Sequence, residues 1–392
     1  MTVKHWAGTV RTPGMALGTL CEPGQDARGN IVAAQEFTLA QALAVEGAAG
    51  IVTGHTPPGS HVAAVLGALG VPWLDGLCVS PDGYGHAAVL DALSGRLTLD
   101  PDETCVQNAH AAARALAGGL ASLRERACRV RPSAPDGAPV KVLATLNDLS
   151  QASAALAGGA EGVGLLRSEF LCGSEAIPSE DAQTWAYRSL PGPWPVVRLL
   201  DAAGDKPLPG CPPVRGIRLL ACRPDLLRTQ MRALLRASAE KPLRICYPFV
   251  TSPQELRDAR QLLETCREAL AREGVPTGRL EPGAMLETPA AVLTLRSLAE
   301  EASFFCLGSG DLTQHTLGVD RGDAGGLYDP RHPAVLRLTA LAARDARRLG
   351  KDLCVCGPLA EDVGMARRLA ALGVRALSVS APLVPHVRLA LG

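Results

Sequence analysis

The run FFCLGSGDL at residues 304–312 is one of a series of short segments that decide the fold of the longer part of this chain. It is almost continuously apolar, and it ends on small residues, an aspartate and a leucine. Such runs are typical of strands in a parallel sheet that helices cover on its faces. Seven similar runs occur along the chain: VKVLATL 140–146, GVGLLRSEF 162–170, VVRLLD 196–201, RICYPFV 244–250, GAMLETP 283–289, LCVCGPL 353–359 and ALSVSAP 376–382.

Segments with helical periodicity, such as residues 252–273, separate these runs. Eight strand–helix units over about 250 residues favour a closed barrel over an open doubly wound sheet. The sequence therefore predicts an α/β protein whose C-terminal part is a (β/α)8 TIM barrel. Only a short segment, residues 382–392, remains for the closing helix, so we expect that helix to be short or missing.

The segment VRPSAPDGAP at residues 130–139 marks a boundary, because it holds three prolines and no hydrophobic run. The preceding residues 103–129 are rich in alanine, lack proline and carry apolar residues at helical spacing, which predicts one long helix. We therefore expect a small α/β domain at 1–102, a linker helix and linker at 103–139, and the barrel at 140–392.

The composition excludes several classes of protein. With 39 basic and 39 acidic residues the chain has no net field that would draw it to nucleic acid or to an anionic membrane. We find no apolar run of about 18 residues and no signal segment, and so expect a cytoplasmic protein without membrane insertion. Twelve scattered cysteines without a CxxC pair favour buried thiols in a reducing compartment.

Charged and thiol side chains stand at the predicted carboxyl ends of the barrel strands and in the loops that follow, where such barrels carry their chemistry. Arginines can clamp phosphate and carboxylate, and two carboxylates from neighbouring strands can hold Mg²⁺. This pattern indicates a site for a small, doubly anionic substrate bound through a metal, although salt bridges across the barrel mouth are the alternative. The residues concerned are Arg167, Arg198, Arg218, Arg321, Glu287, Asp311 and Cys356.

A different signal lies in the first domain, where His61 follows a Gly/Pro turn and precedes the helix-forming run VAAVLGAL. Backbone N–H groups and the helix dipole at that position would stabilise a phosphoryl group on the imidazole. Taken alone, the same pattern is also typical of an ordinary surface histidine.

Both parts of the chain resemble Enzyme I of the bacterial phosphoenolpyruvate:sugar phosphotransferase system, a phosphoenolpyruvate-protein phosphotransferase. The wider family of phosphoenolpyruvate-utilising enzymes includes pyruvate phosphate dikinase and phosphoenolpyruvate synthase. GSHVAAVLGALGVPWL at residues 59–74 is similar to the phosphohistidine signature. The barrel segments that carry the resemblance are GAEGVGLLRSEFL 159–171, VVRLLDAAGDK 196–206, LRTQMRALLRAS 227–238, MLETPAA 285–291 and GSGDLTQHTLGVDRG 308–322.

The resemblance implies an enzyme that moves the phosphoryl group of phosphoenolpyruvate to His61, releases pyruvate, and passes the phosphoryl group to an acceptor. It implies that the first domain swivels between the barrel and that acceptor, and that the barrel forms a homodimer. It also implies the site roles: Arg167, Arg198, Arg218 and Arg321 hold phosphoenolpyruvate, Glu287 and Asp311 bind Mg²⁺, and Cys356 donates the proton that completes pyruvate.

The chain departs from the Enzyme I pattern in several places. Gly310 replaces the asparagine before the metal-binding aspartate, Gly59 replaces a threonine before Ser-His, and Pro358 replaces a glutamate after Cys-Gly. The helical subdomain that docks the carrier protein HPr is missing, because only residues 21–30 bridge that gap. We therefore expect a truncated form whose phosphoacceptor is unidentified.

Two other functions fit the sequence. One is a non-catalytic, phosphoenolpyruvate-sensing or regulatory homologue of Enzyme I, with the altered motifs as signs of lost turnover. The other is a Mg²⁺-dependent barrel lyase or aldolase acting on enolates, which would leave His61 without a role.

Overall fold

The computed structural model describes residues 4–56, 61–171, 177–201, 214–320 and 326–392 of the chain. Their contacts divide the protein into two compact units, Met1–Glu125 and Arg126–Gly392. Across the described residues, no helix is both long enough and apolar enough to cross a membrane.

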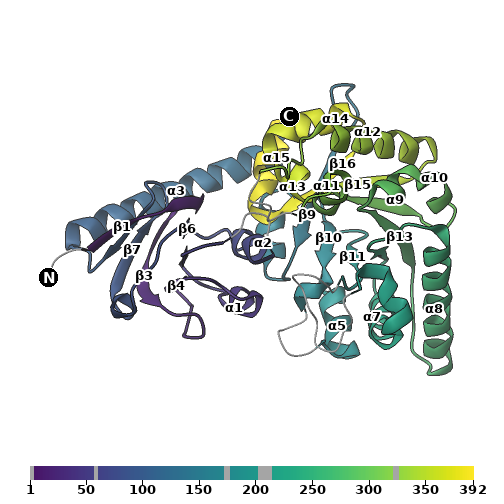
Figure 1. The fold of residues 1–392 in the computed structure, drawn as a ribbon, viewed down its shortest axis with the longest axis horizontal. Helices are drawn as coiled ribbons and strands as arrows, with labels where there is room; N and C mark the ends of the chain where they lie inside the picture. The colour runs from purple at the N-terminus through teal and green to yellow at the C-terminus, as the bar shows by residue number, and fades with distance from the viewer. Residues whose placement is uncertain (1–3, 57–60, 172–176, 202–213, 321–325) are drawn as a thin grey trace. The chain divides into compact units, whose positions relative to one another are not determined.

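The second unit is a closed barrel of parallel strands, which confirms the predicted fold (Figure 1). Every strand pairs in parallel with its neighbours, and β16 closes the barrel against β9. The strands are β9 (Lys141–Leu146), β10 (Val163–Arg167), β11 (Val196–Arg198), β12 (Leu243–Tyr247), β13 (Leu280–Leu286), β14 (Phe304–Gly308), β15 (Asp352–Cys356) and β16 (Ala376–Ser380).

Alternation along these strands divides the core of the barrel in two. One set of side chains forms an inner cluster that includes Leu165, Met285, Phe304 and the thiols of Cys354 and Cys356. The other set packs outward against the surrounding helices in a larger cluster. Because successive side chains on a strand point to opposite faces, this pattern fixes which residues reach the inside of the barrel.

The helices between the strands start where the sequence offers caps. Ser252 and Glu255 form a capping box at the start of α8, in which each side chain meets the other residue's backbone. The helices of this unit are α4 (Gln151–Ala157), α5 (Glu180–Arg188), α6 (Leu219–Cys222), α7 (Pro224–Ala237), α8 (Pro253–Arg272), α9 (Pro289–Leu293), α10 (Leu295–Leu298), α11 (Ser309–Leu317), α12 (Pro333–Arg348), α13 (Pro358–Glu361), α14 (Ala366–Ala371) and α15 (Val384–Leu391).

The closing helix, α15, is present but has only 8 residues, as the brief tail after the last strand predicted. Its buried Arg388 donates from Nε to the carbonyl of Ala127 at 3.0 Å and from Nη2 to the carbonyl of Val130 at 2.7 Å. These carbonyls lie at the C-terminal end of α3 (Glu103–Arg129), where backbone acceptors lack helical partners and a cation is favourable. Arg388 thus ties the last helix to the entry of the barrel.

Arg388→Met should lower the free energy of unfolding of the barrel by roughly 2–3 kcal/mol, because it leaves buried carbonyls without their charged donor. Arg367→Met is the matched control, since the exposed Arg367 makes one hydrogen bond, to the carbonyl of Ala390. Chemical denaturation of both variants measures the difference. Equal losses would show that the buried contacts add nothing.

The first unit is a mixed sheet with the strand order β1-β8-β7-β3-β4-β5-β6-β2. Strands β3 to β6 run in parallel at its centre, and the remaining pairs are antiparallel. The strands are β1 (Lys4–Ala7), β2 (Thr9–Thr12), β3 (Met15–Cys21), β4 (Ile31–Ala34), β5 (Gly50–Thr53), β6 (Trp73–Asp75), β7 (Ala87–Asp91) and β8 (Arg96–Leu99), with the helices α1 (Leu39–Ala44) and α2 (His61–Ala68).

The long helix predicted at 103–129 is observed as α3, and the contacts divide the chain inside it. Most of the described cysteines are buried, as expected, but Cys78, Cys128 and Cys222 are exposed.

Candidate active site

Two arginines stand side by side at the mouth of the barrel. Arg167 and Arg198 are register partners at the carboxyl ends of β10 and β11. Arg198 is buried, is paired with Glu169, and has its Nη1 3.7 Å from Oε1 of Glu287. Burial opposes its charge, but the surrounding carboxylates, led by Glu169, raise the pKa of Arg198 above its usual range. The guanidinium therefore stays charged inside the mouth.

A buried network holds this corner of the barrel in place. The hydroxyl of Ser168 donates to the carbonyl of Arg198 at 2.6 Å, and Nε2 of Gln230 donates to that hydroxyl at 2.7 Å. Oε1 of Gln230 accepts from the backbone N–H of Leu200 at 3.0 Å. Gln230 on α7 thus braces the two strands that carry the arginines.

The two predicted metal ligands follow neighbouring strands. Glu287 comes directly after β13, and Asp311 lies in the first turn of α11, which follows β14. Both are buried, and burial together with the nearby Asp311 raises the pKa of Glu287 to about 8. Neither carboxylate oxygen of Glu287 accepts a hydrogen bond from the residues that the structure describes. Without a cation beside it, such a buried carboxyl group keeps its proton at neutral pH, so its ionised form needs a counter-charge.

The geometry adds a residue that sequence reasoning missed. Arg215 donates to Asp201, with Nη2 2.6 Å from Oδ2, and to Asp311, with Nη1 3.0 Å from Oδ1. Its carboxylate partners raise its pKa in spite of burial. Arg215 and Arg218 stand three residues apart in the segment VRGIR, and their spacing alone does not show which one faces the mouth.

The other predicted arginines have different positions. Arg218 contacts Thr251 and Glu255, with Nε 3.5 Å from the Glu255 carboxylate, and its side chain is 47% exposed. These contacts place it at the start of α8, whereas Arg215 meets the carboxylates of the mouth. Arg321 lies outside the described residues.

Cys356 ends β15, and its thiol donates to the carbonyl of Leu307 at 3.4 Å. Burial and the neighbouring Cys306 raise the pKa of the Cys356 thiol to about 12, and Arg167 is the nearby cation that opposes this shift. The thiol therefore keeps its proton at neutral pH, the state that a general acid needs.

The loop after Cys356 is held by the SGD motif. Ser309 donates its hydroxyl hydrogen to the carbonyl of Cys356 at 2.7 Å and accepts from the N–H of Leu359 at 3.1 Å. Gly357 has φ +82°, and a Cβ there would stand 3.0 Å from Oγ of Ser309. Two of the residues that differ from the Enzyme I pattern are accommodated here: Pro358 is the first residue of α13, and Gly310 is buried in the first turn of α11.

His61 belongs to the first unit and is the first residue of α2, as the sequence predicted. Gly59 and the other residues of the stretch 57–60 lie outside the described residues, as does the side chain of His61. Thr56, the last described residue before that stretch, is anchored, because Nη2 of Arg11 donates to its carbonyl at 2.8 Å and to Asp75 at 2.5 Å. The structure thus supports a helix N-terminus at His61.

We define the mouth cluster as Glu169, Arg198, Asp201, Arg215, Glu287 and Asp311. In this described set, four carboxylates stand against two guanidinium groups, with Arg167 beside Arg198 as a third, and the raised pKa of Glu287 indicates that its charged form is disfavoured without a further cation. A bound divalent cation would lower that pKa and stabilise the charged forms of Glu287 and Asp311. Among the described residues, no group of three or more His, Cys, Asp or Glu side chains forms a metal cage. Glu287 and Asp311 fit Mg²⁺ instead, which commonly takes one or two carboxylates and completes its shell with substrate and water.

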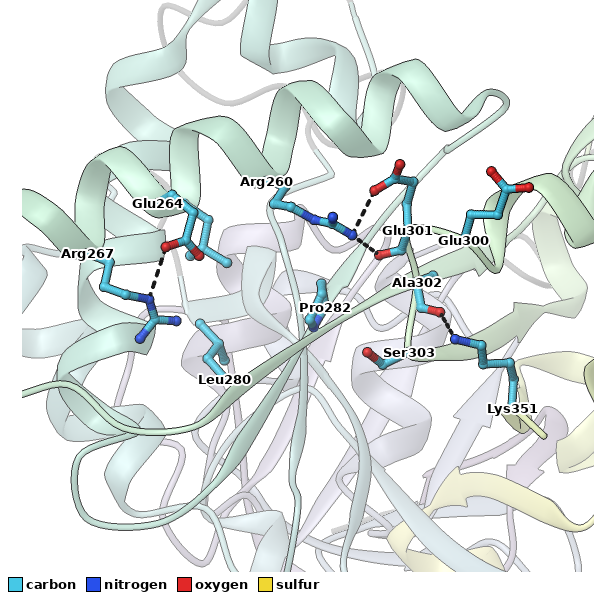
Figure 2. A pocket seen from close by; sticks show the side chains of 11 residues that line it. Arg260, Glu264, Arg267, Leu280, Pro282, Glu300, Glu301, Ala302, Ser303 and Lys351 are labelled. Carbon is cyan, nitrogen blue, oxygen red and sulfur yellow. Dashed lines mark hydrogen bonds and ion pairs between the residues drawn. The ribbon is translucent and has the colours of Figure 1, made fainter. Parts of the chain in front are cut away.

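A separate hollow of about 280 Å³ lies at the opposite end of the barrel (Figure 2). It is lined by Leu280, the first residue of β13, and by Ser303, just before β14. Its cationic side chains already have partners, as Figure 2 shows for Arg260, paired with Glu301 at 2.7 Å. The hollow is therefore remote from the strand ends that carry the mouth cluster.

Comparison with known proteins supports the resemblance seen in the sequence. Residues 124–392 match the family described as PEP-utilising enzyme, PEP-binding domain. The chain is 40% identical over 362 residues to a phosphoenolpyruvate-protein phosphotransferase of Streptomyces coelicolor, covering 86% of this chain and 62% of that protein. It is 37% identical to a multiphosphoryl transfer protein of Rhodobacter capsulatus, covering 86% of this chain and 42% of that one.

The chain thus spans about three fifths of the length of the Streptomyces relative, 62%. Among solved structures, it is similar to an HpcH/HpaI aldolase/citrate lyase family protein from Burkholderia cenocepacia. That likeness has a TM-score of 0.41 and 18% identity, and covers 67% of this chain and 93% of that one. It is too distant to inform function.

Proposed function

Because the chain belongs to the family of PEP-utilising enzymes, we propose that it transfers the phosphoryl group of phosphoenolpyruvate to its own His61 and releases pyruvate. The observation that supports this most is the mouth cluster, in which buried carboxylates and guanidinium groups meet beside a protonated thiol. A small dianion with a divalent cation matches that pattern of charge.

The arginines bind and orient the substrate in this proposal. Arg167, Arg198 and Arg215 present planar donors to the phosphate and the carboxylate, and Arg321 and Arg218 remain further candidates from the sequence. Glu287 and Asp311 would hold Mg²⁺, which when bound supplies positive charge next to the phosphate oxygens.

Transfer begins with neutral His61. A ring nitrogen of His61 forms a bond to phosphorus while the bond from phosphorus to the enol oxygen breaks, and that oxygen keeps the electron pair. The resulting enolate takes a proton at its methylene carbon from the Cys356 thiol, which gives pyruvate. The N-terminal end of α2 would then stabilise the phosphorylated imidazole through the helix dipole.

The experiment that tests this function is the stoichiometry of pyruvate release when the protein meets phosphoenolpyruvate and Mg²⁺ without an acceptor. Self-phosphorylation predicts one equivalent of pyruvate per chain and then a stop. A sensor would bind phosphoenolpyruvate without releasing pyruvate, and a lyase or aldolase would form a different small product; either result would contradict the proposal.

Cys356→Ser should slow the formation of pyruvate by about 10²–10⁴-fold, the usual contribution of a general acid. Affinity for phosphoenolpyruvate should change little, because the thiol meets the substrate only when the proton moves. Cys354→Ser is the matched control, since Cys354 belongs to the same inner cluster two residues before the end of β15. An unchanged rate of pyruvate formation in Cys356→Ser would show that Cys356 is not the proton donor.

The protein should transfer its phosphoryl group to free HPr only slowly. Residues between β3 and β4 form turns and no helix, so the surface that docks HPr in Enzyme I has no counterpart in this connection. Transfer between two imidazoles needs a docking surface that aligns them. The assay compares labelled protein with an intact Enzyme I at micromolar HPr, and comparable rates would contradict the prediction.

A further inference from the structure

Phe249 has an unusual backbone and an unusual neighbour. It follows β12 by two residues, is 4% exposed, and adopts the left-handed conformation with φ +55°, which is uncommon for a bulky side chain. The guanidinium carbon of Arg215 lies 4.0 Å from the centroid of its ring. The ring of His315 meets the same residue edge-on, with centroids 5.7 Å apart and an interplanar angle of 89°.

The backbone around Arg215 is docked onto the same place. The N–H of Ile217 donates to the carbonyl of Pro248 at 2.9 Å. Gly216 has φ +58°, and a Cβ there would stand 2.6 Å from the Pro248 oxygen and 2.9 Å from Cβ of Phe249. Only glycine allows so close an approach, and so the segment that carries Arg215 lies directly against the Phe249 loop.

Arg215 also reaches across the mouth cluster. Its Nη2 is held by Asp201 and its Nη1 by Asp311, so two carboxylates hold the donor groups of the guanidinium while its central carbon lies over the Phe249 ring. A flat aromatic face restricts a guanidinium in a way that an aliphatic side chain of similar size does not.

We propose that Phe249 is a positioning residue for substrate binding: its ring face holds Arg215 in the orientation in which the guanidinium meets an anionic phosphate or carboxylate. This inference rests on the proposed function, which makes the mouth cluster a phosphoenolpyruvate site. In this proposal Phe249 acts through Arg215, whose guanidinium carbon lies over its ring, while His315 packs against the same ring in a T-shaped arrangement.

The test is a double-mutant cycle on the full chain carrying His61→Ala, which cannot take up the phosphoryl group, with equilibrium binding of phosphoenolpyruvate in the presence of Mg²⁺ measured by calorimetry. Phe249→Leu should weaken binding by about 3–30-fold, the range expected for the loss of a cation–π contact. In an Arg215→Met background the same change should have no further effect, because the group that Phe249 positions is gone.

Phe305→Leu is the control for general damage to the barrel, because Phe305 is fully buried in the outer cluster of the same barrel. It should lower the melting temperature and leave the affinity unchanged. Unchanged binding in Phe249→Leu, or an equal loss with and without Arg215, would overturn the inference. If the wild type binds phosphoenolpyruvate without phosphorylating itself, the proposed function is wrong, but the cycle still tests the role of Phe249. A wild type that does not bind phosphoenolpyruvate would overturn both the proposed function and the role of Phe249.

Discussion

His61→Ala is expected to abolish the incorporation of a phosphoryl group from phosphoenolpyruvate, while binding of phosphoenolpyruvate to the barrel persists. The reason is chemical: alanine offers no nitrogen that can form the bond to phosphorus, and the binding groups lie in the other unit of the chain. Incubation with labelled phosphoenolpyruvate measures the incorporation, as protein-bound label that is stable in base and lost in acid. Calorimetry measures the binding of phosphoenolpyruvate.

The matched control for this variant is His55→Ala. His55 is an exposed histidine six positions earlier in the same unit. It should incorporate label as the wild type does. Undiminished label in His61→Ala, or loss of label in both variants, would contradict the assignment of His61 as the phosphorylated residue.

Glu287→Gln and Asp311→Asn should each reduce the rate of phosphoryl transfer by roughly 10³-fold, because each removes half of the carboxylate pair that we assign to Mg²⁺. Each should also raise the Mg²⁺ concentration needed for half-maximal rate. Rapid-quench measurements across a range of Mg²⁺ concentrations give both quantities for each variant.

A carboxylate on the same strand provides the control. Glu281 lies near the amino end of β13, where it pairs with Arg244 and Arg279. Glu281→Gln should leave the Mg²⁺ dependence unchanged even where it lowers stability. An unaltered Mg²⁺ requirement in Glu287→Gln and Asp311→Asn would show that this pair does not hold the metal.

Much of the barrel could be predicted because its signals are local. Each strand is a short apolar run that ends on or just before a charged or polar residue, so Arg167, Arg198 and Glu287 could be expected at the mouth of the barrel, where the structure has them. Arg218, which the sequence also suggested, contacts the start of α8 instead. Arg198 illustrates the successful case, since a guanidinium at the end of an apolar strand must find partners within the protein. The apolar run that ends on Arg198 was therefore enough to predict that this end of the strand carries a paired or ligand-binding charge.

Loops were less predictable because their residues are placed by tertiary contacts. Arg215 and Arg218 carry the same functional group and lie in the same short segment, VRGIR. Arg215 meets Asp201 and Asp311 because Gly216 lets its segment pack closely against Pro248 and Phe249. Asp201 and Glu169 were likewise missed as partners. Their role follows from the distances between strands that pair side by side, which a single sequence does not encode as a pattern.

The central claim, that the chain phosphorylates itself on His61, is tested most directly by mapping the modified residue. The wild-type protein is incubated with phosphoenolpyruvate and Mg²⁺, digested at neutral or basic pH, and analysed by peptide mass spectrometry. The account predicts one phosphoryl group, on the peptide that contains His61, in amounts equal to the pyruvate released. Pyruvate formed without any phosphorylated peptide, or a phosphoryl group on another residue, would contradict it.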